Sequence, residues 1–212
     1  ELNKREADES HKQHGHELPG SGNELGKDVN RPSVGNPSGQ TLLDSADAVS
    51  PISAMIWTIH YGLDNYGVDS VSRLAKKIKD TGAGIIGLLE TDSLRVFNGN
   101  RDVVEYIAQQ VGYTNIDYGP TTLDSTFGCA LITKYRILSV KRYIMPSPMG
   151  ELACLIHAKL DIGGFTMNTY VGHWGNTDHV QDIKLQSQFL GELAKANPGP
   201  SVFLGYLTTK PS

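Results

Sequence analysis

Apolar residues follow two spacings after residue 50, and each spacing predicts one type of element. Short apolar or alternating runs bounded by Gly, Pro, Asn or Asp are typical of β-strands, whereas steps of three and four residues are typical of helices. The runs that predict strands span 54–60, 84–90, 114–119, 126–133, 136–144, 151–162, 165–174 and 201–207. Turn-forming residues, such as the pair Gly163 and Gly164, separate the longer runs.

Three further segments carry the helical spacing. Their apolar faces comprise Val71, Leu74, Ala75 and Ile78; Val103, Val104, Ile107 and Val111; and Val180, Ile183, Phe189, Leu190 and Leu193. We expect the first helix to follow Asp69 as its N-cap, the second to span about 100–111, and the third about 178–196. Gly112 is the expected end of the second helix.

The order of these elements predicts an α/β fold. Strand–helix–strand units flank a long block of strands, which favours two sheets packed face to face with helices outside over a helical bundle. Residues 1–50 are polar and rich in Gly, Ser, Pro and charge, so we expect a flexible lead-in there. Residues 51–212 are the expected single domain.

Charge and composition narrow the classes of function. The net charge of -4 and pI near 6 provide no basic face, so we expect no nucleic-acid partner. No run reaches the roughly 18–20 apolar residues of a membrane helix. Because the chain lacks a starting Met and stops just after an apolar strand, we expect a piece of something longer. Cys129 and Cys154 favour two buried thiols, with one bridge in an oxidising compartment as the alternative.

Polar residues stand where three of the predicted strands end. Glu90 closes the run 84–90, His173 closes 165–174 with Trp174, and His60 closes 54–60 before a Gly-containing loop. Carboxylate oxygens are ligands that Mg²⁺ accepts, and an imidazole can act as an acid or stabilise a phosphoryl oxygen. Each residue alone also fits an ordinary strand end, but together they predict a shared site at one edge of the fold.

Other residues carry weaker expectations. Asp92 lies two positions after Glu90, and Thr126 is expected to point toward the same edge. His157 lies inside an apolar strand, which favours a structural role. Trp57 and Trp174 are expected to pack in the core or at its rim.

The order of segments resembles the endonuclease/exonuclease/phosphatase superfamily from about residue 55 to 211. The strings IWTIHYG, GIIGLLETD, FGCALITKYRI, VGHWG and VFLGYLTTKP carry the resemblance. It implies a four-layer α/β sandwich whose last strand is cut off here, and Mg²⁺-dependent cleavage of phosphoester bonds. It also implies that Glu90 matches the metal-binding Glu and His173 the strand-end His.

The chain departs from the superfamily pattern at the last visible strand and at the first. Tyr206 and Thr208 stand where the family has the Asp and Asn of Gly-Asp-x-Asn, and Thr58 falls where the first Asn belongs. The usual carboxylate that orients the nucleophile is therefore missing. Groups of this kind often contribute about 10²–10⁴-fold to the rate.

A narrower resemblance fits these departures. The strings GLLETD, FGCALITK, PSPMGELA and LGYLTTKP resemble the C-terminal domain of the membrane-protein family that remodels GPI-anchor lipid to ceramide. This implies placement on the luminal side of the endoplasmic reticulum membrane, as part of a larger multi-pass protein. The implied partners are the GPI lipid or GPI-anchored protein and the membrane portion of the same protein.

Three functions follow from these observations. The first is exchange of a diacylglycerol-type lipid for ceramide at the GPI inositol phosphodiester. The second is a conventional Mg²⁺-dependent phosphodiesterase or nuclease, and the third is a non-catalytic module that binds the GPI headgroup. In the first reading, His173, Glu90 and His60 are the expected catalytic residues, and Glu90 is also the expected metal ligand. The expected substrate-binding residues are Asp92, Thr126, Tyr206 and Thr208.

Overall fold

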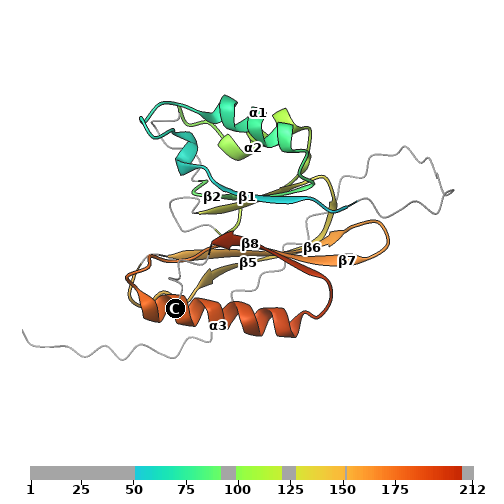
Figure 1. Cartoon of the computed structure of the whole chain (residues 1–212). Coiled ribbons are helices and arrows are strands. Elements are labelled where there is room, and N and C mark those ends of the chain that lie inside the picture. Colours follow the sequence, from blue (N-terminus) through green and yellow to red (C-terminus); the bar gives the residue numbers. More distant parts are fainter. Residues whose placement is uncertain (1–50, 92–98, 121–127, 151, 207–212) are drawn as a thin grey trace, which may run out of the picture.

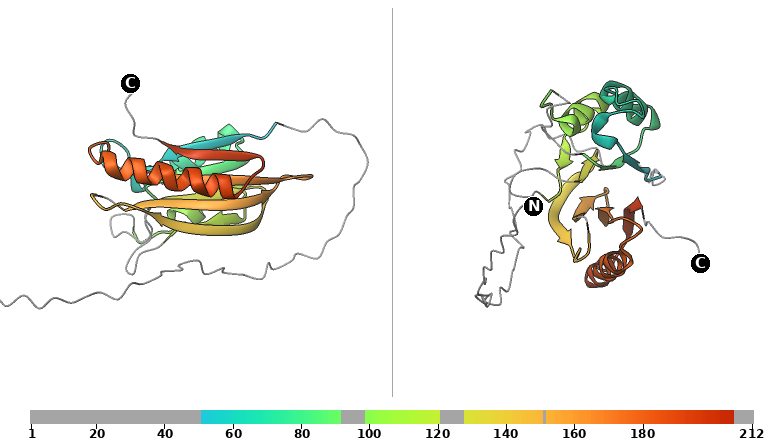
Figure 2. Two further views of the ribbon diagram at one scale, coloured as in Figure 1. Left: turned by 90° about the horizontal axis from the view of Figure 1, so that it is seen from below. Right: turned by 90° about the vertical axis from the view of Figure 1, so that its left-hand side faces the viewer.

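The computed structural model describes residues 51–91, 99–120, 128–150 and 152–206, and they form four layers. Figure 1 shows two β-sheets stacked face to face, with helices α1 and α2 outside one sheet and α3 outside the other. Figure 2 shows the same helices at opposite ends of the stack. The four-layer α/β sandwich expected from the sequence is confirmed.

The first sheet is formed entirely by the N-terminal half of the domain. Its strands are β1 (Ala54–Thr58), β2 (Ile85–Leu89), β3 (Asn115–Asp117) and β4 (Cys129–Thr133), in the order β1-β2-β4-β3. Strands β1 and β2 are parallel, so their carboxyl ends meet at the same edge. Every residue of β2 is buried, because one face packs on the second sheet and the other on helices.

The second sheet is formed entirely by the C-terminal half. Its strands are β5 (Arg136–Met145), β6 (Ala153–Asp161), β7 (Thr166–His173) and β8 (Ser201–Tyr206), in that order across the sheet. The first three strands are antiparallel neighbours, while β7 and β8 are parallel and joined through α3. The end of β7 therefore lies beside the end of β8, with His173 opposite Tyr206 in register.

The helices agree with the predicted segments but begin later. They are α1 (Val71–Thr81), α2 (Val103–Val111) and α3 (Val180–Ala196), and a short 3₁₀ turn, η1, spans His60–Gly62. Gly112 ends α2 in the left-handed conformation, as expected, with φ of 90°. None of the described helices is long and apolar enough to cross a membrane.

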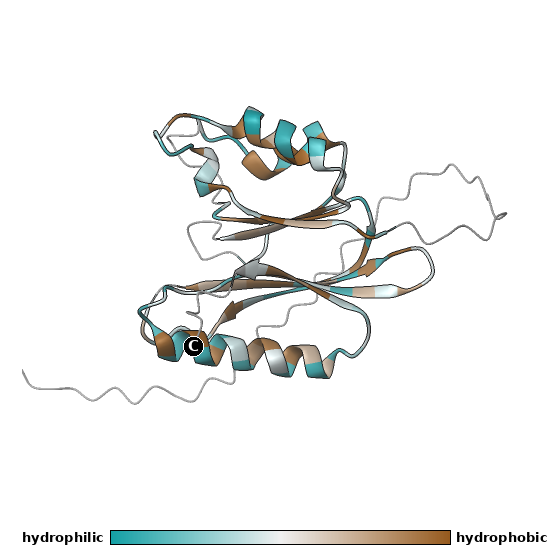
Figure 3. Cartoon of the chain, viewed as in Figure 1, coloured by the Kyte–Doolittle hydropathy of each residue, from teal (hydrophilic) through white to brown (hydrophobic). Residues whose placement is uncertain are grey.

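Two details of the helix predictions were wrong. The N-cap of α1 is Ser70, although the neighbouring Asp69 carboxylate accepts a hydrogen bond from the Val71 N–H at 3.0 Å. Val180 was expected to face inward but is 72% exposed, because it is the first residue of α3 and extends beyond the sheet. Figure 3 shows the resulting amphipathic helices, with hydrophilic colour on the outer side of α1.

The alternation of side chains along β2 explains two of the three apolar layers. Ile85 and Leu89 point into the layer between the sheets, whereas Ile86 and Leu88 pack under α1 and α2. Gly87 lies on the first of these faces, where an added Cβ would come within 3.0–3.2 Å of side chains from β1, β7 and β8. The third apolar layer lies between the second sheet and α3 and contains Trp174.

Candidate active site

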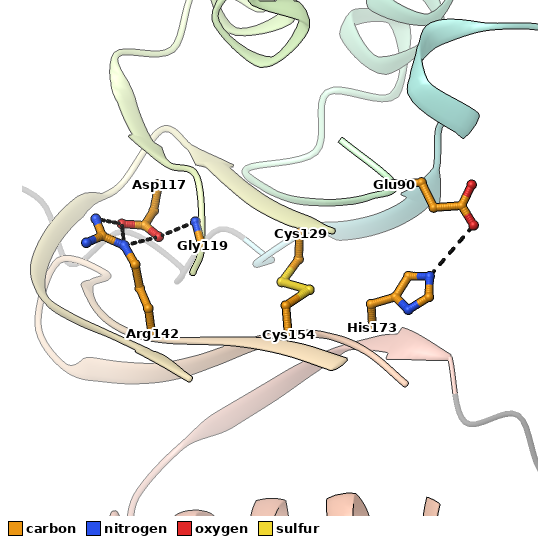
Figure 4. The surroundings of a disulfide bond; sticks show 7 residues. All are labelled: Glu90, Asp117, Gly119, Cys129, Arg142, Cys154 and His173. Atoms are coloured by element: carbon orange, nitrogen blue, oxygen red, sulfur yellow. Dashed lines mark hydrogen bonds and ion pairs between the residues drawn. A yellow bond between two sulfur atoms is a disulfide. The ribbon is translucent and has the colours of Figure 1, made fainter. Parts of the chain in front are cut away.

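Three of the sequence-predicted residues meet at the edge where β1, β2 and β7 end. The His173 Nε2 lies 3.7 Å from Glu90 Oε1, and the His60 Nε2 lies 3.8 Å from Glu90 Oε2. Glu90 comes from the first sheet and His173 from the second, and Figure 4 shows the two side chains directed toward each other. One carboxylate thus lies between two imidazoles.

The three side chains differ in access to solvent. The side chain of His173 is 8% exposed, that of Glu90 is 24% exposed, and that of His60 is 61% exposed. The site therefore runs from a buried imidazole at the second sheet to an open one at the rim.

The backbone at two of these residues is strained. His60 has φ of 46° and Glu90 has φ of 56°, in the left-handed region that residues other than Gly seldom adopt. Backbone hydrogen bonds hold this conformation: Glu90 N–H donates to the Gly128 carbonyl at 2.7 Å, and Tyr61 N–H donates to the Glu90 carbonyl at 2.9 Å. Strain of this kind clusters at functional sites, because it fixes side chains in directions that a relaxed strand end would not give.

A disulfide bond joins the two sheets behind this site. Cys129 of β4 and Cys154 of β6 are paired, with Cα atoms 6.3 Å apart. The expectation of two buried thiols was wrong, because the packed sheets bring together strands that are distant in sequence. Cys129 is opposite Leu89 in register, and Cys154 is opposite His173. The disulfide therefore links the immediate strand neighbours of the Glu90 and His173 segments.

An ion pair that sequence reasoning missed joins the sheets on the other side of the disulfide (Figure 4). Arg142 Nε donates to both carboxylate oxygens of Asp117, at 3.0 and 3.1 Å, and the Gly119 N–H donates to Oδ1 at 2.9 Å. The Asp117 side chain is 3% exposed. The hydrogen bonds to Asp117 raise the pKa of Arg142, so its guanidinium stays charged. No local sequence pattern marks either residue, because the two come together only when the sheets stack.

A cavity of about 490 Å³ opens beside His60, between the end of β1 and one face of α1. Trp57 and Tyr66 supply aromatic surface, and Arg73 and Lys77 supply positive charge. No local sequence pattern groups these four residues. His60 lines this cavity and its Nε2 also lies 3.8 Å from Glu90 Oε2, so His60 belongs to both the cavity and the site.

The remaining predicted residues divide into two groups. Asp92, Thr126 and Thr208 lie outside the described residues. The backbone of Tyr206 ends β8 next to His173, and its side chain also lies outside what the structure describes. Among the described residues, no group of three or more His, Cys, Asp or Glu side chains is arranged to hold a metal ion.

His157 has the structural surroundings expected for it. Its ring stacks on Tyr170 at 4.6 Å between centroids, and its Nε2 lies 3.0 Å from the Asn168 Oδ1. Burial lowers the pKa of His157, and its position opposite Tyr170 in the middle of the sheet separates it from the strand ends.

Known proteins resemble this chain at two levels. Residues 50–212 match the family described as the PGAP2IP C-terminal nuclease-like domain. Protein cwh43 of Schizosaccharomyces pombe is 40% identical over 157 residues, which are 74% of this chain and 16% of that protein. The chain thus spans about one sixth of the length of this curated relative.

Solved structures share the fold at low sequence identity. An endonuclease/exonuclease/phosphatase from Beutenbergia cavernae superposes with a TM-score of 0.64 at 20% identity, covering 74% of this chain and 47% of that one. The protein TDP2 of Danio rerio, crystallised with a single-strand DNA product, gives 0.60 at 14% identity, covering 76% and 62%. These similarities show the endonuclease/exonuclease/phosphatase fold. The family match over residues 50–212, together with the 40% identity to the cwh43 protein, shows that the chain belongs to the PGAP2IP C-terminal nuclease-like domain family.

Proposed function

We propose that this domain acts on the inositol phosphodiester of GPI anchors during exchange of a diacylglycerol-type lipid for ceramide. The single observation that carries the proposal is the placement of Glu90 between His60 and His173 at the open edge of a phosphoesterase-type fold. The resemblance of the sequence to the family that remodels GPI-anchor lipid supports the choice of a lipid substrate over nucleic acid, as does the net charge of -4.

The exchange needs balanced proton transfer at one phosphorus atom. The phosphorus–oxygen bond to the departing glycerol breaks, and a new bond forms to the hydroxyl oxygen of ceramide. The proton of the incoming hydroxyl must leave, and the departing oxygen must gain one. Two imidazoles on either side of a carboxylate suit these tasks, one accepting and one donating a proton, while Glu90 orients both rings.

The surroundings suggest how the two imidazoles divide this work. His173 is nearly buried, so its ring is fixed and suited to contacting a phosphate oxygen. His60 is mostly exposed and can exchange protons with water. Both Nε2 atoms lie within 3.8 Å of the Glu90 carboxylate, so a phosphate bound beside that carboxylate would reach both rings for charged contacts, which act over about 4–6 Å.

A magnesium ion fits this edge only together with the substrate. Glu90 would supply one carboxylate ligand, and phosphate oxygens and waters would complete the oxygen shell that Mg²⁺ requires. When bound, the ion would supply positive charge to the phosphate. The roles given to His60 and His173 depend on side chains of this chain alone.

The setting of this reaction is part of the proposal. A lipid substrate requires the domain to work at a membrane surface, and we place it on the luminal side of the endoplasmic reticulum, attached to a multi-pass membrane portion. The partners would be the GPI lipid or GPI-anchored protein and that membrane portion. The disulfide between Cys129 and Cys154 supports an oxidising compartment.

One observation favours a second function. Tyr206 stands where the resembled superfamily has a catalytic Asp, which favours a non-catalytic module that binds the GPI headgroup and presents it to the membrane portion. Both functions use the same three side chains to hold phosphate. They differ in whether the purified domain turns over a phosphodiester.

The proposal predicts that His173→Ala in the full-length parent protein abolishes ceramide-containing anchors. Cells lacking the parent would receive either form, and the lipid of purified GPI-anchored proteins would be measured by mass spectrometry. We expect the wild type to restore ceramide anchors and the variant to lose at least about 10²-fold in activity, the low end for an acid–base group. Arg136→Ala, at a distant strand start, is the control for expression. Restoration by His173→Ala at equal protein abundance would remove His173 from the site.

A further inference from the structure

The cavity beside His60 has the composition of a binding site for a ring with many hydroxyl groups. Trp57 and Tyr66 line it, and the Tyr66 side chain projects from the loop after η1 with 92% of the residue exposed. A ring-shaped polyol has apolar C–H faces that pack on aromatic rings and hydroxyl edges that need hydrogen-bond partners. Ligand sites commonly combine apolar surface with a few placed polar groups in this way.

The loop that carries Tyr66 is held in place before any ligand arrives. The Asp64 Oδ1 accepts hydrogen bonds from the N–H groups of Tyr66 and Val68, both at 3.0 Å. The Asp64 Oδ2 accepts from Arg73 of α1. The hydrogen bond from Val68 is the largest cause that lowers the pKa of Asp64, so the carboxylate stays charged. The backbone of the loop that carries Tyr66 is therefore tied to α1 through Asp64 and Arg73.

The helix supplies positive charge on one face. Ser70, Arg73, Leu74 and Lys77 all line the cavity, at the spacing of three and four residues that places side chains on one side of a helix. Lys76, which is also exposed, is absent from the lining residues. Lys77 and Arg73, whose guanidinium is paired with the Asp64 carboxylate, thus lie beside the aromatic residues and complement a ligand that carries both a ring and a phosphate.

The charged residues of the cavity lining also indicate which part of a lipid substrate the cavity binds, an acyl chain or the polyol headgroup. An acyl chain in this cavity would take Lys77 and the Arg73–Asp64 ion pair out of water without replacing their hydrogen bonds to water, which is costly. A polyol replaces those bonds through its hydroxyl groups. We propose that the cavity binds the inositol ring of the substrate, with its phosphate reaching past His60 to Glu90 and His173. This inference rests on the proposed function, because it assigns the second half of the same substrate.

Three soluble probes test the assignment: inorganic phosphate, myo-inositol and myo-inositol 1-phosphate. Binding to the 212-residue chain would be followed by titration with detection of backbone amide chemical shifts. We expect the wild type to bind inositol 1-phosphate more tightly than inorganic phosphate. Tyr66→Ala should reduce that advantage by roughly threefold to tenfold, the range for a lost aromatic contact, whereas Tyr66→Phe should keep it.

Lysine substitutions on α1 provide a matched control for charge. Lys77→Ala should weaken inositol 1-phosphate binding, and Lys76→Ala, with the same change of net charge on the same helix, should leave it unchanged. Equal binding by the wild type, Tyr66→Ala and Lys77→Ala would overturn the assignment of the cavity.

The binding measurements distinguish failure of the cavity assignment from failure of the proposed function. If inorganic phosphate binds through His173 but inositol adds no affinity, the cavity assignment is wrong and the phosphate site stands. If free inositol binds and Tyr66→Ala abolishes its binding, while phosphate never binds, the cavity assignment stands and the proposed function is wrong.

Discussion

At the scale of single residues, the candidate site depends on backbone conformation as much as on side-chain chemistry. Glu90 follows a buried strand, and its positive φ turns the carboxylate across to the second sheet. A sequence pattern can indicate that a carboxylate ends a strand, but it carries no signal for this turn. The presence of a carboxylate at the end of this strand was therefore predictable, whereas the direction of the Glu90 side chain was not.

Two substitutions of Glu90 both remove the carboxylate but differ in the backbone strain that they leave. Glu90→Ala keeps the unfavourable φ of 56°, whereas Glu90→Gly relieves it. After allowance for the greater freedom of Gly in the unfolded chain, we expect Glu90→Gly to be more stable than Glu90→Ala by about 0.5–1 kcal/mol. Urea denaturation of both variants measures this difference in the free energy of unfolding. A more stable Ala variant would mean that the strain is absent in solution.

His157 predicts a pH dependence of stability that is independent of the site. Burial lowers its pKa below the usual 6.5, so the folded state prefers the neutral ring and the unfolded state takes up a proton first. The stabilisation is complete above pH 6.5 and is lost as pH falls toward the folded pKa. In His157→Gln the amide can still donate to Asn168 and does not titrate. Its unfolding free energy should fall less between pH 7.5 and 5.5 than that of the wild type. If the unfolding free energies of the variant and the wild type changed equally with pH, the pH dependence would come from other groups.

At the scale of elements, periodicity located the strands and helices because each has an apolar face to bury. Helix α2 agrees with the prediction in its apolar face and in its end at Gly112. The predicted end of β1 was wrong: the run expected to end at His60 stops at Thr58, because His60 belongs to η1. Burial patterns do not encode such local turns, and two of the three candidate site residues, His60 and Glu90, lie outside the strands.

The disulfide is the element-scale feature with the largest expected effect on stability. It closes a loop of 25 residues and ties β4 to β6. For a loop of this size, restriction of the unfolded chain predicts a loss of about 2–4 kcal/mol in the double variant Cys129→Ala, Cys154→Ala. Urea denaturation of the variant and of the wild type, the latter with and without reductant, would measure this loss. A wild type unaffected by reductant and as stable as the double variant would show that the bond contributes nothing.

At the scale of the whole molecule, the sequence predicted the stacking of the sheets and the meeting of the strand ends, but not the other contacts between elements. The four-layer sandwich followed from element order and from resemblance, and the meeting of His60, Glu90 and His173 followed from the rule that strand ends share an edge. The pairing of Asp117 with Arg142 depends on how two sheets stack, which no local pattern specifies. The same applies to the cavity lined by Tyr66 and Lys77.

The division of the two sheets between consecutive halves of the chain has a thermodynamic consequence. Residues 54–133 provide His60 and Glu90, residues 136–206 provide His173, and the complete site exists only while the halves are docked. Any ligand that contacts both histidines must therefore favour the docked form, by RT ln(1 + [L]/Kd) for free ligand concentration [L]. The melting temperature of the domain should then rise with substrate concentration, so heat resistance itself would report occupancy.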